Sequence, residues 1–235
     1  MSAVDRSDAE LSFSFARFSD GFDEHIRRSI RGYADLLSDC VALSEYFVGN
    51  DAVVLDIGCS TGSFLGNVRS RNHNRCPRAR YIGVDIEANF APYWQEESRG
   101  DIEFRVADIQ SFPIPRSCSF VTSIFSLQFI PEGARQNIVN QIFQALVPGG
   151  AMVVAEKTLC NSSKLNDMLT FIHYDFKRQS FTEAEILAKE RSLRSLMKPW
   201  SEQQITNSFA AAGFAPDKTQ CFWRSHNFAA FIALR

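Results

Sequence analysis

The sequence lacks any run of about 18 apolar residues, the length that a membrane-spanning helix requires. Residues 1–11 are polar and acidic, which is not typical of a secretory signal peptide. The six cysteines are scattered and include no Cys-x-x-Cys pair, which argues against a zinc site and against a disulfide framework. From these absences we expect a cytoplasmic protein without a membrane contact or a bound metal ion.

The sequence also lacks a strong excess of either charge, because 25 basic and 27 acidic residues leave a formal charge of −2. Such a balance gives no bulk attraction to nucleic acid, so direct nucleic-acid binding is not expected. Aromatic residues are distributed unevenly, with 21 Phe, 5 Tyr and 3 Trp. Phe15 and Phe18 belong to a cluster near the N-terminus that either packs in a core or covers a cationic ligand.

Short apolar segments alternate with helical patterns from residue 51 onward. Strands are predicted at 52–56, 81–85, 102–106, 120–125 and 151–155. Helices are predicted at 63–71, 87–97 and 132–146. Strands that alternate with helices indicate a parallel sheet with both faces covered.

Two further strands, at 218–223 and 227–234, are separated by a short turn and must therefore pair antiparallel. A helix at 201–212 precedes them and ends at Gly213. The predicted fold is α/β, a doubly wound and mostly parallel seven-stranded sheet that ends in a hairpin. This Rossmann-like arrangement is typical of class I methyltransferases.

Helical segments precede and interrupt this alternation. Residues 22–47 show mostly helical spacing, with a break at Gly32. Two more helices are predicted within 160–198, the second of which opens with the capping-box pattern Thr182 to Glu185.

These segments suggest a division of the chain into two parts. We expect an N-terminal helical cap at 1–50 and a methyltransferase-like domain at 51–235, with a helical insertion at 160–198.

The turn after the first predicted strand carries the sequence Asp56-Ile-Gly-Cys-Ser-Thr-Gly62. Glycines at such a turn let the backbone approach a ligand, which lies beyond the carboxyl ends of the strands. The turn lacks the G-x-G-x-x-G pattern of nicotinamide-dinucleotide sites, so S-adenosylmethionine is favoured over NAD as the cofactor.

Three later segments support this interpretation. Asp85 ends the second predicted strand, where a carboxylate accepts hydrogen bonds from both hydroxyls of a ribose. Asp108 and Ile109 follow the third strand, where they suit the amino group and the ring of adenine. Phe125 follows the fourth strand, at the place expected for the methionine part of the cofactor.

The sequence resembles the carboxy-S-adenosylmethionine synthases from about residue 22 to residue 233. Besides the glycine turn, the likeness includes Arg28-Ser-Ile-Arg-Gly-Tyr33, Glu156-Lys157, His173 and Asp175-Phe-Lys-Arg178. Members of this family make a carboxylated cofactor from S-adenosylmethionine and prephenate for tRNA wobble-uridine modification. The resemblance implies a homodimer, and it implies cofactor contacts at Tyr33, Gly58, Cys59, Ser60, Asp85, Ile86, Asp108 and Ile109.

The sequence departs from the family pattern at two positions. Ile124 stands where the family has an asparagine that contacts the cofactor. Glu190 stands where the family has an arginine, supplied by the second subunit, that pairs with the added carboxylate; Arg191 is one residue further along. Loss of that arginine would remove a charge-assisted contact. We therefore expect a relative that uses S-adenosylmethionine for another reaction.

Candidate catalytic residues are few. His173 and Tyr174 lie on the helical insertion, where one of them is a candidate general base or hydrogen-bond partner, although His173 also suits a packing role. Tyr33 is the third candidate. Because aromatic faces attract a sulfonium cation, we also consider a set of aromatic residues: Phe15, Phe18, Tyr33, Phe125, Phe129 and Tyr174.

The predicted function is that of an S-adenosylmethionine-dependent transferase acting on a small molecule, with methyl transfer as the first hypothesis. Three alternatives stay open. One is the carboxylating activity of the family, with Arg191 replacing the lost arginine. Another is cyclisation of the methionine arm, which releases methylthioadenosine. The last is a non-catalytic module that binds the cofactor, against which the intact glycine turn and both carboxylates argue.

Overall fold

The computed structural model describes residues 21–235, whose strands form one sheet in the order β3-β2-β1-β4-β5-β8-β7, with β6 paired to β5. The strands are β1 Val53–Ile57, β2 Arg80–Asp85, β3 Ile102–Val106, β4 Cys118–Ile124, β5 Leu146–Leu159, β6 Trp200–Ser201, β7 Thr219–Ser225 and β8 Phe228–Leu234. The pairs from β3 to β5 are parallel, and β8 pairs antiparallel with both β5 and β7. The predicted α/β sheet with its terminal hairpin is confirmed.

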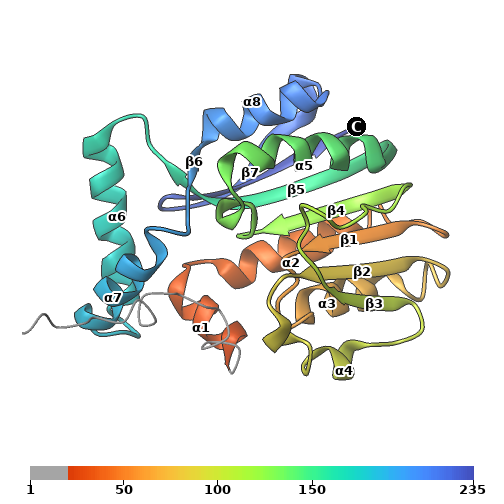
Figure 1. Ribbon diagram of the computed structural model, residues 1–235, viewed down its shortest axis with the longest axis horizontal. Helices are drawn as coiled ribbons and strands as arrows, with labels where there is room; N and C mark the ends of the chain where they lie inside the picture. Colours follow the sequence, from red (N-terminus) through yellow and green to blue (C-terminus); the bar gives the residue numbers. More distant parts are fainter. Residues whose placement is uncertain (1–20) are drawn as a thin grey trace, which may run out of the picture.

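The described part of the chain has eight α-helices, which cover the two faces of this sheet and lie beyond one of its ends (Figure 1). They are α1 Phe22–Ser29, α2 Tyr33–Ser44, α3 Ser63–Asn72, α4 Trp94–Glu97, α5 Glu132–Ala145, α6 Ser163–Lys177, α7 Glu183–Leu193 and α8 Glu202–Ala212. Short 3-10 helices are η3 Ala88–Phe90, η4 Leu127–Phe129 and η5 Pro216–Lys218. None of the helices within residues 21–235 is both long enough and apolar enough to cross a membrane.

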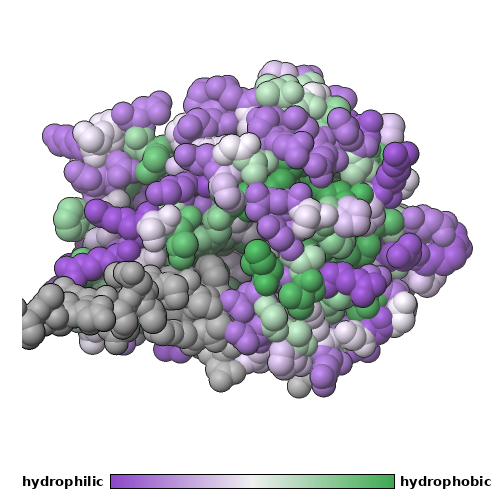
Figure 2. All heavy atoms as spheres, in the orientation of Figure 1, coloured by the Kyte–Doolittle hydropathy of each residue, from purple (hydrophilic) through white to green (hydrophobic). Residues whose placement is uncertain are grey.

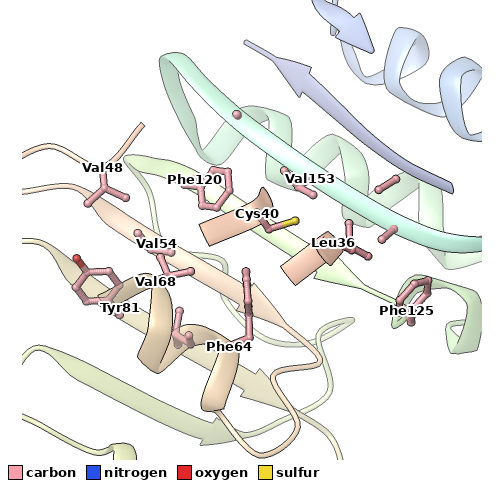
Figure 3. Close-up of a cluster of buried hydrophobic side chains, with 14 of the residues drawn as sticks. Leu36, Cys40, Val48, Val54, Phe64, Val68, Tyr81, Phe120, Phe125 and Val153 are labelled. Atoms are coloured by element: carbon pink, nitrogen blue, oxygen red, sulfur yellow. The ribbon is translucent and has the colours of Figure 1, made fainter. Parts of the chain in front are cut away.

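One face of the sheet is covered by α2 and α3. Leu36 and Cys40 of α2 are fully buried, and they lie near Phe120 of β4 and Val153 of β5 (Figure 3). Full burial of a leucine side chain contributes roughly 1.5–3 kcal/mol. Since Tyr33 belongs to the same apolar cluster, the N-terminal helices share a core with the sheet.

The opposite face is covered by α5 and α8. Ile138 and Ile142 of α5, and Phe209 of α8, pack in one cluster with Leu55 of β1 and Val154 of β5. Strands buried on both faces explain why the sequence shows short continuous apolar runs rather than alternation.

Helices α6 and α7 lie together beyond the end of the sheet at which β4 and β5 finish, with α1 close to them (Figure 1). The expected capping box at the start of α7 is present, because Thr182 and Glu185 hydrogen-bond to each other's backbone N–H groups. The predicted break at Gly32 is also confirmed, since this glycine separates α1 from α2 with a φ of 75°.

The predicted helix at 87–97 is wrong. The structure has only the 3-10 helix η3 and the four-residue α4 in this segment. Pro92 lies between them. A proline has no N–H to donate to the carbonyl of the preceding turn, so it interrupts a continuous helix.

Candidate functional site

A cavity of about 320 Å³ lies at the carboxyl ends of β1, β2 and β4, bounded by α1, α6 and α7. Its size suits a small-molecule site, which typically spans roughly 300–1,000 Å³. Hydrophobic residues gather toward the middle of the face shown in Figure 2, with hydrophilic residues over much of the remaining surface.

At Gly58 the glycine turn closely approaches Ser126, in the segment that follows β4. A Cβ atom at this position would lie 2.5 Å from the Cβ of Ser126, and the residue has a φ of 75°. Both the space and the backbone conformation therefore require glycine. Ser60 has a φ of 46°, which is uncommon for a residue with a side chain. It also lines the cavity.

Asp85 lies at the end of β2 and is 8% exposed. One carboxylate oxygen accepts from the backbone N–H of Ser60 at 2.8 Å, and the other accepts from that of Glu87 at 2.9 Å. Burial raises the pKa of Asp85 despite these bonds. The carboxylate is thus held rigidly at the cavity wall, with lone pairs left to receive further donors such as ribose hydroxyls.

The positions expected for the adenine and for the methionine arm also line the cavity. Asp108 accepts a hydrogen bond from the backbone N–H of Gln110 at 2.9 Å, which orients its carboxylate, and Ile109 beside it is buried. Ile86 is 70% exposed yet belongs to the lining, as an apolar rim residue would. Ile124, where the resemblance implies asparagine, places an apolar side chain in the wall.

Asp56 also lines the cavity, although no separate role was expected for it. It is 3% exposed and accepts a hydrogen bond from the hydroxyl of Thr122 at 2.7 Å. Burial raises its pKa to about 7, with the hydrogen bond from Thr122 opposing the shift. A carboxyl group in this place is suited to pair with an amine or a sulfonium cation.

Aromatic rings follow one another along the cavity. Tyr33 and Phe125 have ring centroids 6.0 Å apart, Phe125 and Phe228 5.7 Å apart, and Phe228 and His173 5.1 Å apart. This series connects the N-terminal helices to α6. It provides apolar and π surface where the sulfonium of a bound cofactor would be favoured.

The end of the cavity near α6 and α7 is basic. It is lined by Lys157 of β5, Lys177 of α6, and Lys189 and Glu190 of α7. The ammonium of Lys157 lies 3.6 Å from the carboxylate of Glu190. Lys189 donates to the imidazole of His25 on α1, and burial lowers the pKa of Lys189 to about 8.

The cavity is therefore electrically divided. Asp85 and Asp108 lie near β2 and β3, whereas the lysines lie near β5 and the helical insertion. In the order β2-β1-β4-β5, three strand spacings correspond to about 14 Å. Such a cavity suits a cation at one end and an anion at the other.

Of the predicted site residues, all but one line this cavity. Those that do are Tyr33, Gly58, Cys59, Ser60, Asp85, Ile86, Asp108, Ile109, Ile124, Phe125 and His173. Tyr174 is not in the lining. Among the other aromatic candidates Phe129 lines the cavity, while Phe15 and Phe18 lie outside the described residues.

The neighbouring residues Glu190 and Arg191 have different surroundings in the folded subunit. Glu190 does not present an isolated negative charge to the cavity, because Lys157 pairs with it and two further lysines line the same end. Arg191 is exposed and does not line the cavity of its own subunit.

The lysines themselves were missed as site residues. Lys177 stands four residues after His173, which places both side chains on one face of α6. This i, i+4 spacing could have predicted that His173 and Lys177 contribute to one site. The approach of Lys157 and Lys189 to it carries no local signal, because they belong to other elements.

Comparison with known proteins defines the class. Residues 54–150 match the family model of a methyltransferase domain. An O-methyltransferase family protein of Burkholderia thailandensis superposes with a TM-score of 0.64 at 14% identity, covering 93% of this chain and 60% of that one. Human N-acetylserotonin methyltransferase, solved in complex with SAM, gives 0.59 at 15% identity, covering 98% and 57%. The chain has the fold of the class I S-adenosylmethionine-dependent methyltransferases.

The more specific relatives are named carboxy-S-adenosyl-L-methionine synthase. The protein of Erwinia tasmaniensis is 34% identical over 93% of this chain and 89% of its own length. That of Salmonella paratyphi C is 32% identical, again over 93% and 89%. The chain belongs to this family. Three expectations from the sequence are thereby confirmed, namely the family, the class of S-adenosylmethionine-dependent transferases and S-adenosylmethionine as the cofactor.

Proposed function

We propose that this protein makes carboxy-S-adenosylmethionine from S-adenosylmethionine and prephenate. The ring carboxylate of prephenate is transferred to the S-methyl carbon, the proton lost from that carbon leaves as water with the ring hydroxyl of prephenate, and phenylpyruvate is the second product. The observation that carries the proposal is the basic end of the cavity, where Lys157 neutralises Glu190 while Lys177 and Lys189 also line the wall. Prephenate is an anion with two carboxylates. Three lysines and one glutamate leave an excess of positive charge, which attracts such a substrate.

The remaining residues suit the cofactor. Gly58 permits the close approach of a ligand to the backbone, and Asp85 is placed to accept from the ribose hydroxyls. The bound cofactor would supply an activated carbon next to its sulfonium. Phe125 and Tyr33 offer aromatic surface beside that position and exclude water from it.

The test is an incubation of the protein with S-adenosylmethionine, with and without prephenate, followed by mass spectrometry. We expect a carboxylated cofactor only when prephenate is present. Absence of that product at saturating substrate would refute the proposal. Methylthioadenosine formed without a second substrate would instead indicate cyclisation of the methionine arm.

A second candidate is methyl transfer to an anionic small molecule. The observation in its favour is Ile124, an apolar lining residue where the family contacts the cofactor through asparagine. Under this hypothesis the lysines would hold a carboxylate of the methyl acceptor. S-adenosylhomocysteine formed on addition of a carboxylate acceptor, without any carboxylated cofactor, would support it over the first candidate.

We also infer that the protein is a homodimer, as the family resemblance implies. Helix α6 supports this inference with a group of large apolar side chains that are 45–61% exposed, namely Leu165, Met168, Phe171 and Ile172. An apolar group of this kind on one helix suits contact with a second subunit.

A further inference from the structure

Lys177 is a buried cation with no direct ion-pair partner among residues 21–235, although the carboxylate of Glu190, which pairs with Lys157, raises its pKa from beyond contact distance. The residue is 4% exposed and lines the cavity. Within the described part of the chain, its ammonium makes no hydrogen bond and no ion pair within 4 Å. A charge that is buried without a partner is costly, and burial accordingly lowers the pKa of Lys177. An anionic ligand in the cavity would supply the missing partner.

His173, one turn before Lys177 on α6, is a second buried group with an unsatisfied hydrogen-bonding atom. It is 3% exposed, and its Nδ1 atom has no hydrogen-bond partner among residues 21–235. Burial and the charges of Lys177 and Lys157 lower its pKa to about 3, so the imidazole is neutral and one ring nitrogen carries a proton. A buried imidazole in a cavity wall can thus donate one hydrogen bond to a ligand.

These two side chains line the same cavity as the glycine turn and Phe125, not a separate pocket. His173 packs against Phe228, which packs against Phe125 of the turn after β4. Lys157 is the sheet neighbour of Phe228 in the β5–β8 register. A ligand held by α6 would therefore share the cavity with the methionine arm of the cofactor.

The other two lysines at this end already have a partner in the protein. Lys157 lies against Glu190, and Lys189 donates to His25. Lys177 is thus the cation with the most to gain from an added carboxylate.

We propose that Lys177 and His173 form the carboxylate-binding subsite for the second substrate. The ammonium of Lys177 pairs with one carboxylate oxygen, and the imidazole N–H of His173 donates to the other. The subsite lies within one subunit and takes the place of the arginine that Glu190 has replaced. The ligand class, a small carboxylic acid, rests on the proposed function; the choice of residues rests on their burial and their lack of partners.

The experiment measures carboxylate binding separately from catalysis. The full-length protein is saturated with S-adenosylhomocysteine, which cannot react, and is titrated by calorimetry with prephenate and, as a smaller probe, with malonate. We expect Lys177→Met to weaken the binding of prephenate by about 10- to 100-fold, since it removes a charged hydrogen bond. Lys177→Arg should stay within about threefold of the parent, and His173→Gln should fall between the two.

Two controls separate a binding role from a structural one. Lys164→Met makes the same change at an exposed position of α6, outside the cavity, and should leave the affinity unchanged. The Lys177→Met variant should also bind S-adenosylhomocysteine normally and should melt no earlier than the parent protein, because it removes an unpaired buried charge.

The outcomes separate this inference from the proposed function. Weaker carboxylate binding in Lys177→Met without any carboxylated product in the parent would support the subsite and refute the reaction. A carboxylated product from the parent, with unchanged prephenate affinity in Lys177→Met, would overturn the subsite alone. Failure of both probes to bind the parent protein, or a lower melting temperature of Lys177→Met, would also overturn it.

Discussion

The ammonium of Lys157 on β5 lies 3.6 Å from the carboxylate of Glu190 on α7, and their side chains are only 11% and 22% exposed. The pair joins the helical insertion to the sheet at the basic end of the cavity. It also cancels the charge that Glu190 would otherwise present to a second substrate.

Substitution of Glu190→Gln should strengthen the binding of a carboxylate substrate. Removal of the negative charge leaves Lys157 unpaired, which favours an anion by about 1 kcal/mol, or roughly fivefold in affinity. The KM for prephenate, or its Kd in the complex with S-adenosylhomocysteine, measures the effect. Glu183→Gln makes the same change at an exposed position of α7 and should have no effect. A higher KM in Glu190→Gln would contradict the prediction.

Substitution of Asp85→Asn should weaken the binding of S-adenosylmethionine by roughly 1.5–3 kcal/mol, because charged hydrogen bonds to the ribose are lost. Calorimetry with the cofactor alone measures the change. Asp217→Asn, at an exposed site, is the matched control. Because Asp85 also accepts from two backbone N–H groups, thermal melting should accompany the titration. Unchanged affinity in a folded variant would remove Asp85 from the cofactor site.

Disruption of the apolar face of α6 should dissociate the proposed dimer. We expect the parent protein to be dimeric at micromolar concentration by light scattering, and Met168→Glu with Phe171→Glu to be monomeric. Both side chains are more than half exposed in the subunit, so their replacement should not affect its core. A control with two charges on an exposed polar part of α8, Gln203→Glu with Asn207→Asp, should remain dimeric. A monomeric parent would refute the prediction.

Carboxylate binding should weaken as the pH rises through about 8. Burial, and next the charge of Lys177, lowers the pKa of Lys189 to about 8, so a cation at the basic end is lost above that pH. Glu190 opposes this shift, and His25, whose own pKa burial lowers to about 4, remains neutral throughout. Prephenate titrations between about pH 7 and about pH 9 measure the effect.

The matched control for this pH dependence is Lys189→Met. Asp56 also titrates in the range, at about pH 7, but it is unchanged in the variant. The difference in pH dependence between parent and variant therefore reports Lys189. Identical profiles for the two proteins would show that Lys189 does not contribute charge to the binding of the carboxylate.

Much of the cofactor half of the site was predictable from sequence. The turn at Gly58 and the carboxylates of Asp85 and Asp108 each follow a strand directly, and parallel strands place their carboxyl ends at one edge of the sheet. The position of a short contiguous motif at the end of a strand can be predicted without knowing how the helices pack on the sheet. The failure at 87–97 has a local cause that was also present in the sequence, namely Pro92.

The basic end of the cavity was not predictable from local sequence. The sequence drew attention to Glu190 and Tyr174, but it gave no measure of which charges lie near Glu190 or of what Tyr174 faces. Lys157 meets Glu190 across 33 residues of chain, and Lys189 meets His25 across 164. Contacts of that separation depend on how α6 and α7 pack back over the sheet.

The sequence by itself determined the strand–helix alternation, the glycine turn and the placing of Asp85 and Asp108 directly after their strands, because hydrophobic periodicity and backbone conformation act over a few neighbouring residues. Only the tertiary structure decided the sign of the charge opposite the cofactor. That sign is a sum over β5, α6 and α7, since Coulomb interactions act through space between groups that folding brings together and removes from water. Glu190 stands where the family has an arginine, which is a charge reversal in the sequence. In the folded protein its carboxylate pairs with Lys157, and Lys177 beside this pair has no direct ion-pair partner among residues 21–235.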